Sequence, residues 1–183
     1  RMFYKKNGYL PKSITVINEN LFESCDFLRS ITIPEGVTVI EDNAFKNCDN
    51  LCEVHLPNTL KTIGKGAFSG CESLTSIEIP DGVTEISNRA FYKCKNLSNI
   101  EIPDSVTTIG SYAFSYCKGL TEFTLPSNIT MLNSGVFNSC SNLETVIING
   151  NVTSISTQFL GSCTNLKKVI FNNITTVPSC DGN

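Results

Sequence analysis

The sequence predicts a β-rich α/β solenoid, in which the chain is wound into stacked coils of 23 residues each. Seven cysteines recur at this spacing, a large apolar residue lies three positions before each of them, and a leucine lies three positions after each of them. The cysteines are Cys25, Cys48, Cys71, Cys94, Cys117, Cys140 and Cys163. Repeats of this length indicate a solenoid, because each unit buries its apolar side chains against the next one.

Each repeat contains one short segment that we expect to form a β-strand. Two apolar residues flank a single outward residue and are followed by proline in five copies, as in 77–80 and 100–103. Alternate residues of a strand share a face, and proline can end a strand where ladder hydrogen bonds stop. One strand per repeat therefore predicts a parallel sheet in which equivalent residues of adjacent coils lie side by side.

The remainder of each repeat predicts a second extended segment and a turn. Pairs such as Val83 and Ile86 close the units, and a threonine usually follows the first member, which favours a β-like far side. The Ala-Phe-x-x-Cys-x-x-Leu spacing has a helical period but spans barely two turns, so we expect only a helical turn there. The residue before the repeat leucine is Asn, Ser or Gly in six copies, which predicts a positive φ at that position.

We expect residues 1–183 to form a single domain. A partial N-terminal repeat covers about 8–20, seven cysteine-anchored repeats cover about 21–178, and residues 179–183 form a C-terminal tail. The seventh repeat departs from the pattern, because Leu160 replaces phenylalanine and Asn172 replaces proline. A terminal coil has one solvent-facing side, so such decay is expected at the end of an array.

Charge and hydropathy exclude several function classes. The chain carries 14 Lys and Arg against 17 Asp and Glu, a net charge of −3, without the run of basic residues that would neutralise a phosphate backbone. Nucleic acid is therefore not an expected partner. No apolar stretch approaches the roughly 18 residues of a membrane-spanning helix, and no targeting signal is recognisable. We expect no membrane insertion by this segment.

The cysteine ladder predicts packing rather than chemistry. At inward positions the thiols act as small apolar groups, and we expect them to be reduced. Cys48, Cys52 and His55 form a C-x3-C-x2-H cluster that resembles a zinc motif, but the repeat register places only Cys48 inside, so we expect no metal site. With one histidine and no catalytic constellation, we predict no enzyme activity, no catalytic residue and no cofactor. Cys180 lies beyond the seven evenly spaced cysteines, and we expect its thiol to be free or to pair in a disulfide.

The outward side of the predicted sheet is acidic. Its positions carry eight carboxylates against three cations, a net charge of −5. Glu78 and Glu101 occupy one column in adjacent coils, where like charges are destabilising. Three interpretations are open: a surface for a basic partner, a weak site for a divalent cation, or a solvated face. The candidate binding residues are Glu53, His55, Glu78, Asp81, Glu101, Asp104, Glu122, Thr124 and Glu144.

The repeat unit, exemplified by residues 90–110, resembles the 23-residue unit of BspA-like (Treponema pallidum-type) leucine-rich repeat proteins. The shared register of Phe, Cys, Leu, Ile-x-Ile-Pro and Val-x-x-Ile extends from about Leu10 to Val177. The resemblance implies a right-handed leucine-rich repeat solenoid with a parallel concave sheet. It also implies a non-enzymatic, surface or secreted adhesion-type module that binds a protein partner, such as a host cell-surface or matrix protein, through the concave face. A spacer or intracellular scaffold is the alternative, and the pattern predicts no oligomeric state.

Overall fold

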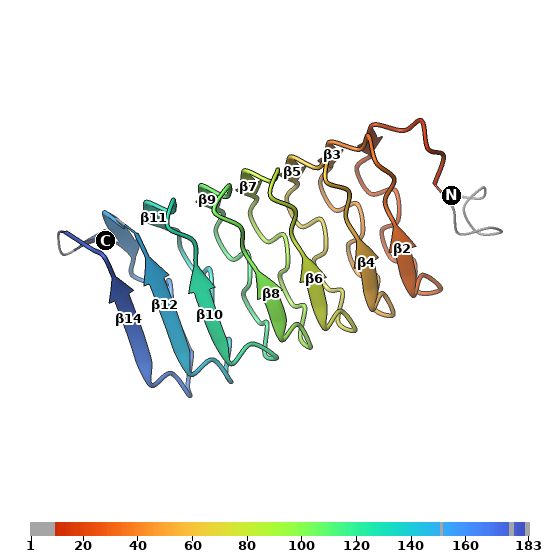
Figure 1. Ribbon diagram of the computed structural model, residues 1–183. Helices are drawn as coiled ribbons and strands as arrows, with labels where there is room; N and C mark the ends of the chain where they lie inside the picture. Colours follow the sequence, from red (N-terminus) through yellow and green to blue (C-terminus); the bar gives the residue numbers. More distant parts are fainter. Residues whose placement is uncertain (1–9, 151, 176–177, 182–183) are drawn as a thin grey trace.

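The computed structural model describes residues 10–150, 152–175 and 178–181, which form a solenoid of stacked coils (Figure 1). One strand of each coil lies on the same side of the solenoid, and the first residues of these strands are spaced 23 positions apart. The strands are β2 (Ser30–Thr32), β4 (Glu53–His55), β6 (Ser76–Glu78), β8 (Asn99–Glu101), β10 (Glu122–Leu125), β12 (Thr145–Asn149) and β14 (Lys168–Asn172). Their parallel pairing in register, with Ile77 opposite Ile100, confirms the predicted solenoid.

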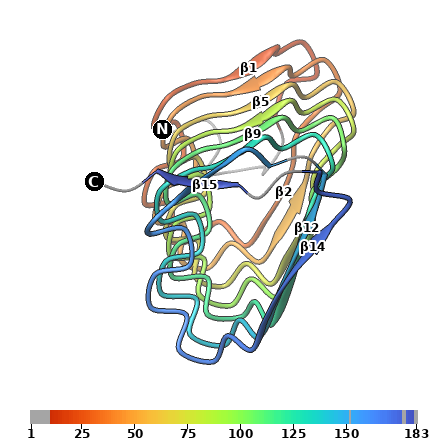
Figure 2. The same cartoon turned by 90° about the vertical axis from the view of Figure 1, so that its left-hand side faces the viewer.

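A second series of strands lies on another side of the coils (Figure 2). They are β1 (Val16–Ile17), β3 (Val39–Ile40), β5 (Thr62–Ile63), β7 (Glu85–Ile86), β9 (Thr108–Ile109), β11 (Met131–Leu132), β13 (Ser154–Ser156) and β15 (Ser179–Asp181). The first five form one parallel sheet and the last three form another. The predicted second extended segment is thus confirmed. Residues 179–181, expected in a tail, instead pair with β13.

The expected helical turn is absent, and the described residues contain no helix that could cross a membrane. Between the two strand series each coil makes consecutive turns. In the first six coils two residues four positions apart have left-handed φ angles, whereas the turn of the last coil has only Ser162 among the described residues. In one of these six coils the two residues are Gly66 at 62° and Gly70 at 76°. Left-handed residues interrupt the run of right-handed ones that a helix requires. Local bonds such as that from the N–H of Cys48 to the carbonyl of Phe45, at 3.2 Å, alternate with bonds to the neighbouring coil, such as that from the N–H of Phe45 to the carbonyl of Ala67 at 2.8 Å.

The predicted positive φ before the repeat leucine is also wrong, because none of those residues is left-handed among the described ones. Their side chains explain the preference for asparagine. Asn50 Nδ2 donates to the carbonyl of Asp26 at 2.8 Å, and Asn96 Nδ2 donates to that of Glu72 at 2.8 Å. An amide side chain reaches across to the preceding coil, so asparagine is favoured here by its donor group rather than by its backbone freedom.

The core consists of columns of identical side chains that run the length of the solenoid. The rings of Phe22, Phe45, Phe68, Phe91 and Phe114 stack face to face, with neighbouring centroids 5.1–5.5 Å apart. The repeat cysteines form a parallel column, and each thiol from the second coil onward donates to the carbonyl of a repeat phenylalanine in the preceding coil at 3.0–3.2 Å. The prediction that cysteine is an inward packing residue is confirmed for the buried members of the column.

Candidate functional site

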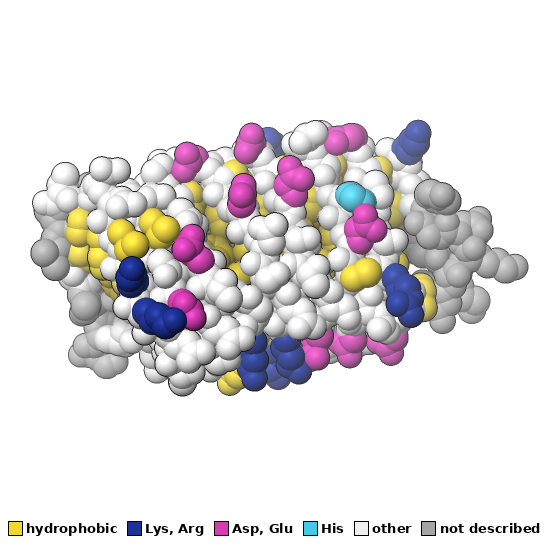
Figure 3. Space-filling model, turned by 60° about the horizontal axis from the view of Figure 1, so that its bottom comes forward, with side chains coloured by type: hydrophobic (Ala, Val, Ile, Leu, Met, Phe, Trp, Pro, Cys, Tyr) yellow, Lys and Arg dark blue, Asp and Glu magenta, His cyan; other side chains and the backbone are white. Residues whose placement is uncertain are grey.

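The outward side chains of β2, β4, β6, β8, β10, β12 and β14, with the residues that flank these strands, form the concave face. Glu53 and His55 lie on β4, whereas Asp81, Asp104 and Glu144 flank strands. The other four predicted residues are Glu78 on β6, Glu101 on β8, and Glu122 and Thr124 on β10. All nine are exposed. Figure 3 shows acidic side chains distributed over this face, one of them beside the single histidine.

Some of these carboxylates have partners within the chain and others do not. Glu53 Oε1 lies 2.9 Å from Nε2 of His55, and Glu144 Oε2 lies 2.9 Å from Nζ of Lys167. The described residues contain no ion pair to the three glutamates of the consecutive strands β6, β8 and β10, which are Glu78, Glu101 and Glu122. The middle of the concave face is therefore its least neutralised part.

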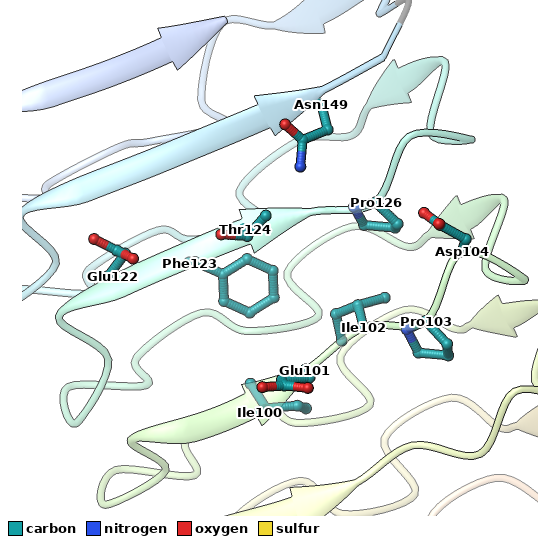
Figure 4. A pocket seen from close by; sticks show the side chains of 10 residues that line it. All are labelled: Ile100, Glu101, Ile102, Pro103, Asp104, Glu122, Phe123, Thr124, Pro126 and Asn149. Atoms are coloured by element: carbon teal, nitrogen blue, oxygen red, sulfur yellow. The ribbon is translucent and has the colours of Figure 1, made fainter. Parts of the chain in front are cut away.

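The strands of this face do not form one continuous sheet. β2 pairs with β4, β6 pairs with β8, and β10, β12 and β14 form a third group, so no ladder joins β8 to β10. A pocket of about 530 Å³ lies at this gap. Its lining consists of Ile100, Glu101, Ile102, Pro103, Asp104, Glu122, Phe123, Thr124, Pro126 and Asn149 (Figure 4).

Phe123 occupies a column of the repeat that is otherwise filled by Ile or Val. Its ring packs against Phe114, with centroids 5.0 Å apart, and against Phe137 at 4.6 Å. Figure 4 shows this ring and the side chain of Ile102 between the two strands. Phe123 is buried beneath the pocket, and the pocket's accessible apolar surface comes from the half-buried Ile100 and Ile102. These lie beside the carboxylates of Glu101 and Glu122, a combination suited to a side chain with an aliphatic stem and a cationic end.

A second gap lies between β4 and β6, where a pocket of about 180 Å³ is lined by Val54, His55, Leu56, Asn58, Glu78 and Pro80. The two gaps bring six of the nine predicted residues together in two groups. His55 and Glu78 border the gap between β4 and β6, whereas Glu101, Asp104, Glu122 and Thr124 border the gap between β8 and β10. Glu53, Asp81 and Glu144 line neither pocket. Sequence reasoning predicted an even stripe and missed these pockets. The aromatic residue at position 123 is the only sequence feature that indicates the larger one.

The repeat thiols are unsuited to nucleophilic or metal chemistry. Burial raises the pKa of Cys48 and of Cys140 to about 12, and it raises the pKa of Cys94 well above the ordinary value of 9.0. A protonated thiol is neither a good nucleophile nor a metal ligand.

The C-x3-C-x2-H cluster does not converge. The buried Cys48 thiol donates to the carbonyl of Phe22 at 3.0 Å. The exposed Cys52 thiol donates to the carbonyl of Arg29 at 3.3 Å, and His55 lies beside Glu53. Within the described part of the chain, no three His, Cys, Asp or Glu side chains are placed to hold a metal ion. The side chain of Cys180 lies outside the described residues.

Comparison with known proteins places this fold among BspA-type leucine-rich repeats. The sequence matches that repeat region over residues 4–95 and 61–180. A leucine-rich repeat protein from Bacteroides ovatus is 33% identical, with a TM-score of 0.74, and the match covers 89% of this chain and 48% of that protein. The Treponema pallidum leucine-rich repeat protein is 34% identical, with a TM-score of 0.75 and coverage of 81% and 71%.

A leucine-rich repeat protein from Eubacterium ventriosum is 25% identical, with a TM-score of 0.63, over 80% of this chain and 50% of its own. The chain thus spans about half the length of the B. ovatus and E. ventriosum proteins. No curated protein sequence matches it significantly.

Proposed function

The chain belongs to the BspA-type leucine-rich repeat family, and on that premise we propose that it is a non-enzymatic protein-binding module of a surface or secreted protein. Its binding surface is the concave face, and its partner is a host cell-surface or matrix protein. A solenoid supports such a role because it presents an extended, rigid surface built from successive coils.

One observation carries the proposal: the pocket between β8 and β10 joins an apolar wall to carboxylates that have no ion pair among the described residues. A lysine or arginine of the partner would place its methylene groups against the half-buried side chains of Ile100 and Ile102 and its charge between Glu101 and Glu122. Charged hydrogen bonds of this kind are shorter and stronger than neutral ones. The partner surface that fits best is therefore basic, with at least one long cationic side chain at its centre.

Capture of proteins from cell-surface and matrix extracts tests the proposal. Three forms are compared: the wild type, the concave variant E78Q/E101Q/E122Q, and a control, E19Q/D49N/E85Q, which removes three charges from other faces. All three should have matching melting curves, because every substituted side chain is exposed. We expect the wild type and the control to retain the same partner and the concave variant to lose it. Equal capture by the concave variant would exclude the concave face, and the absence of any captured protein would favour a spacer role.

A further inference from the structure

A different surface of the solenoid has an uneven charge distribution. We define the turn face as the nine-residue segments that connect the two strand series in the first five coils: 18–26, 41–49, 64–72, 87–95 and 110–118. The first two segments carry Glu19, Glu23, Asp26, Glu41, Asp42 and Asp49 against one lysine, a net charge of −5. The fourth and fifth carry Arg89, Lys93, Lys95 and Lys118 without any acidic residue, a net charge of +4. The third is neutral.

One position of the repeat shows this change from acidic to basic residues in successive coils. The residue after each repeat cysteine is acidic in the first three coils and basic in the next two: Asp26, Asp49, Glu72, Lys95 and Lys118. Along the lower rim in Figure 3, acidic side chains gather towards the N-terminal end and basic side chains follow them. At the junction Lys95 Nζ lies 2.6 Å from Glu72 Oε1. Within the acidic half Lys46 Nζ lies 3.2 Å from Glu23 Oε1. Apart from Lys46 and the neutral third segment, the two charges are segregated along the solenoid.

The basic half also gathers the aromatic side chains of the turn face. Arg89 lies over the rings of Tyr112 and Tyr92, at 5.6 and 5.9 Å from their centroids, and Lys93 lies 5.3 Å from the centroid of Tyr92. Tyr116 meets Tyr92 edge to face at 5.6 Å. Tyrosine and arginine are enriched at the energetic centres of protein interfaces, so the composition of this patch is that of a contact surface.

Backbone strain points to the same patch. The left-handed positions of the first three coils hold small residues, most of them Asn or Gly, which tolerate this region: Asn20, Ser24, Asn43, Asn47, Gly66 and Gly70. In the next two coils the same positions hold Arg89, Lys93, Tyr112 and Tyr116, with φ between 58° and 62°. Long side chains are unfavourable in the left-handed region. The same turn forms with glycine at these positions in the third coil, so the backbone conformation does not require the long side chains.

We infer that the turn face is a self-association surface, on which a second copy of this chain docks in the opposite direction. A two-fold axis through the third coil reverses the order of the coils, so the acidic first and second coils of one copy face the basic fifth and fourth coils of the other. Each complementary contact then occurs twice. The third coil lies on the axis, and its turn segment is neutral because Lys65 balances Glu72. This association uses a surface separate from the concave face and does not depend on its function.

Charge complementarity within one chain is what selects a second copy over other partners. A polyanion would match the basic half and leave the acidic half unexplained, whereas a second copy matches both. Exposed ion pairs are individually weak and are screened by salt. The dimer should therefore be sensitive to ionic strength. In sedimentation equilibrium we expect the apparent mass to approach twice 20.0 kDa at 50 mM salt and to fall towards the monomer at 500 mM.

A charge exchange between two variants provides the decisive test. The variant R89E/K93E/K118E makes the basic half acidic, and the variant E19K/D26K/D49K makes the acidic half basic. Each should be monomeric alone at 50 mM salt, because like charges then face each other across the axis. An equimolar mixture should regain a dimer, since every facing pair is again complementary. The control E78Q/E101Q/E122Q should dimerise like the wild type, and melting curves verify that the variants fold.

Two results would overturn the inference. One is a wild type that remains monomeric at 50 mM salt at a concentration of about 100 µM, a range in which weak protein dimers form. The other is a mixture of the charge variants that fails to associate although both fold. A wild type that stays monomeric but binds heparin, with binding lost in R89E/K93E/K118E, would assign the basic half to a polyanion instead.

Discussion

The third and fifth coils make the same turn with different side chains. The left-handed positions are Gly66 and Gly70 in the third coil, at φ 62° and 76°, and Tyr112 and Tyr116 in the fifth, at 59° and 62°. Both turns lie over repeat phenylalanines that are fully buried. The backbone is therefore determined by the inward residues and by hydrogen bonds between coils. The turn itself does not determine which outward residues occupy these positions.

The fifth coil accommodates its tyrosines through its neighbours. The ring of Tyr112 lies over Gly135 of the next coil, where a Cβ atom would collide with the ring, and its hydroxyl reaches Oε1 of Gln158 at 3.3 Å. The glycine in the sixth coil thus complements the tyrosine in the fifth. Outward residues of this solenoid are selected in groups that extend over several coils, whereas inward residues repeat in every coil.

The largest expected effect is the difference in stability loss between an inward and an outward substitution at adjacent positions. Phe91→Ala removes a ring from the middle of the stacked column and leaves a cavity, so it should lower the free energy of unfolding by about 3–5 kcal/mol. Tyr92→Ala removes an outward ring and should cost less than about 1 kcal/mol. Chemical denaturation of both variants measures the difference. Similar losses at the two positions would contradict the division between scaffold and surface.

A substitution at Gly135 tests the coupling between neighbouring coils. Gly135→Ala places a side chain at φ 64° and against the Tyr112 ring, and it should destabilise the fold by about 2 kcal/mol. In the Tyr112→Gly background only the backbone contribution remains, so the loss should be smaller by at least about 0.5 kcal/mol. A double-mutant cycle of unfolding free energies measures this coupling. Additive losses would show that the two residues are independent.

The buried thiols predict how stability depends on pH. Burial raises the pKa of Cys94 well above 9.0, so above pH 9 the thiol ionises in the unfolded chain but stays protonated in the folded one. The unfolded state then binds fewer protons, and stability falls as pH rises. Full stability is retained below about pH 9, and each such thiol should contribute a loss of about 1.4 kcal/mol per pH unit above it.

The comparison with Cys94→Ala isolates this contribution from other groups that titrate in the same range. Unfolding of both proteins is followed by denaturant titration between pH 8 and pH 10.5. The variant should be less stable at pH 8 but should lose stability less steeply above pH 9. Parallel pH dependences would mean that the Cys94 thiol ionises equally in both states.

The smallest expected effect concerns a strained position in the basic half. Lys93→Asn replaces a long side chain at φ 61° with a residue that tolerates this region. The backbone gain exceeds the loss of the Lys93 contact with Tyr92, so the variant should be about 0.5 kcal/mol more stable. Its self-association should be weaker at the same time. A variant that is destabilised would show that Lys93 serves the fold.

The sequence predicts the solenoid and its register because the inward columns repeat every 23 residues. Phe91, Cys94 and Leu97 each lie where the spacing places them. The expected helical turn is wrong for a physical reason. A local spacing of three residues cannot reveal that alternate N–H groups of the turn, such as those of Phe91 and Lys93, bond to the next coil. Left-handed conformations at Lys93 and Tyr116 follow from that bonding, and neither residue type indicates them.

The candidate site is less predictable than the fold. Register alone places Glu78 beside Glu101, and the structure pairs them. The gap between β8 and β10 is a break in strand pairing, which the pattern of outward residues does not reveal. The basic half of the turn face likewise contains no run of basic residues in the sequence. Lys95 and Lys118 are 23 residues apart and become neighbours only because the coils stack.

Selection of random peptides displayed on phage tests most directly whether the pocket between β8 and β10 carries the binding. The immobilised wild type is the target, and E101Q/E122Q is used for counter-selection at the same salt concentration. We predict peptides with a conserved lysine or arginine, bound at least about tenfold more weakly by E101Q/E122Q because both carboxylates are lost. Enriched peptides without basic residues, or equal affinity for the two proteins, would contradict the assignment of binding to this pocket.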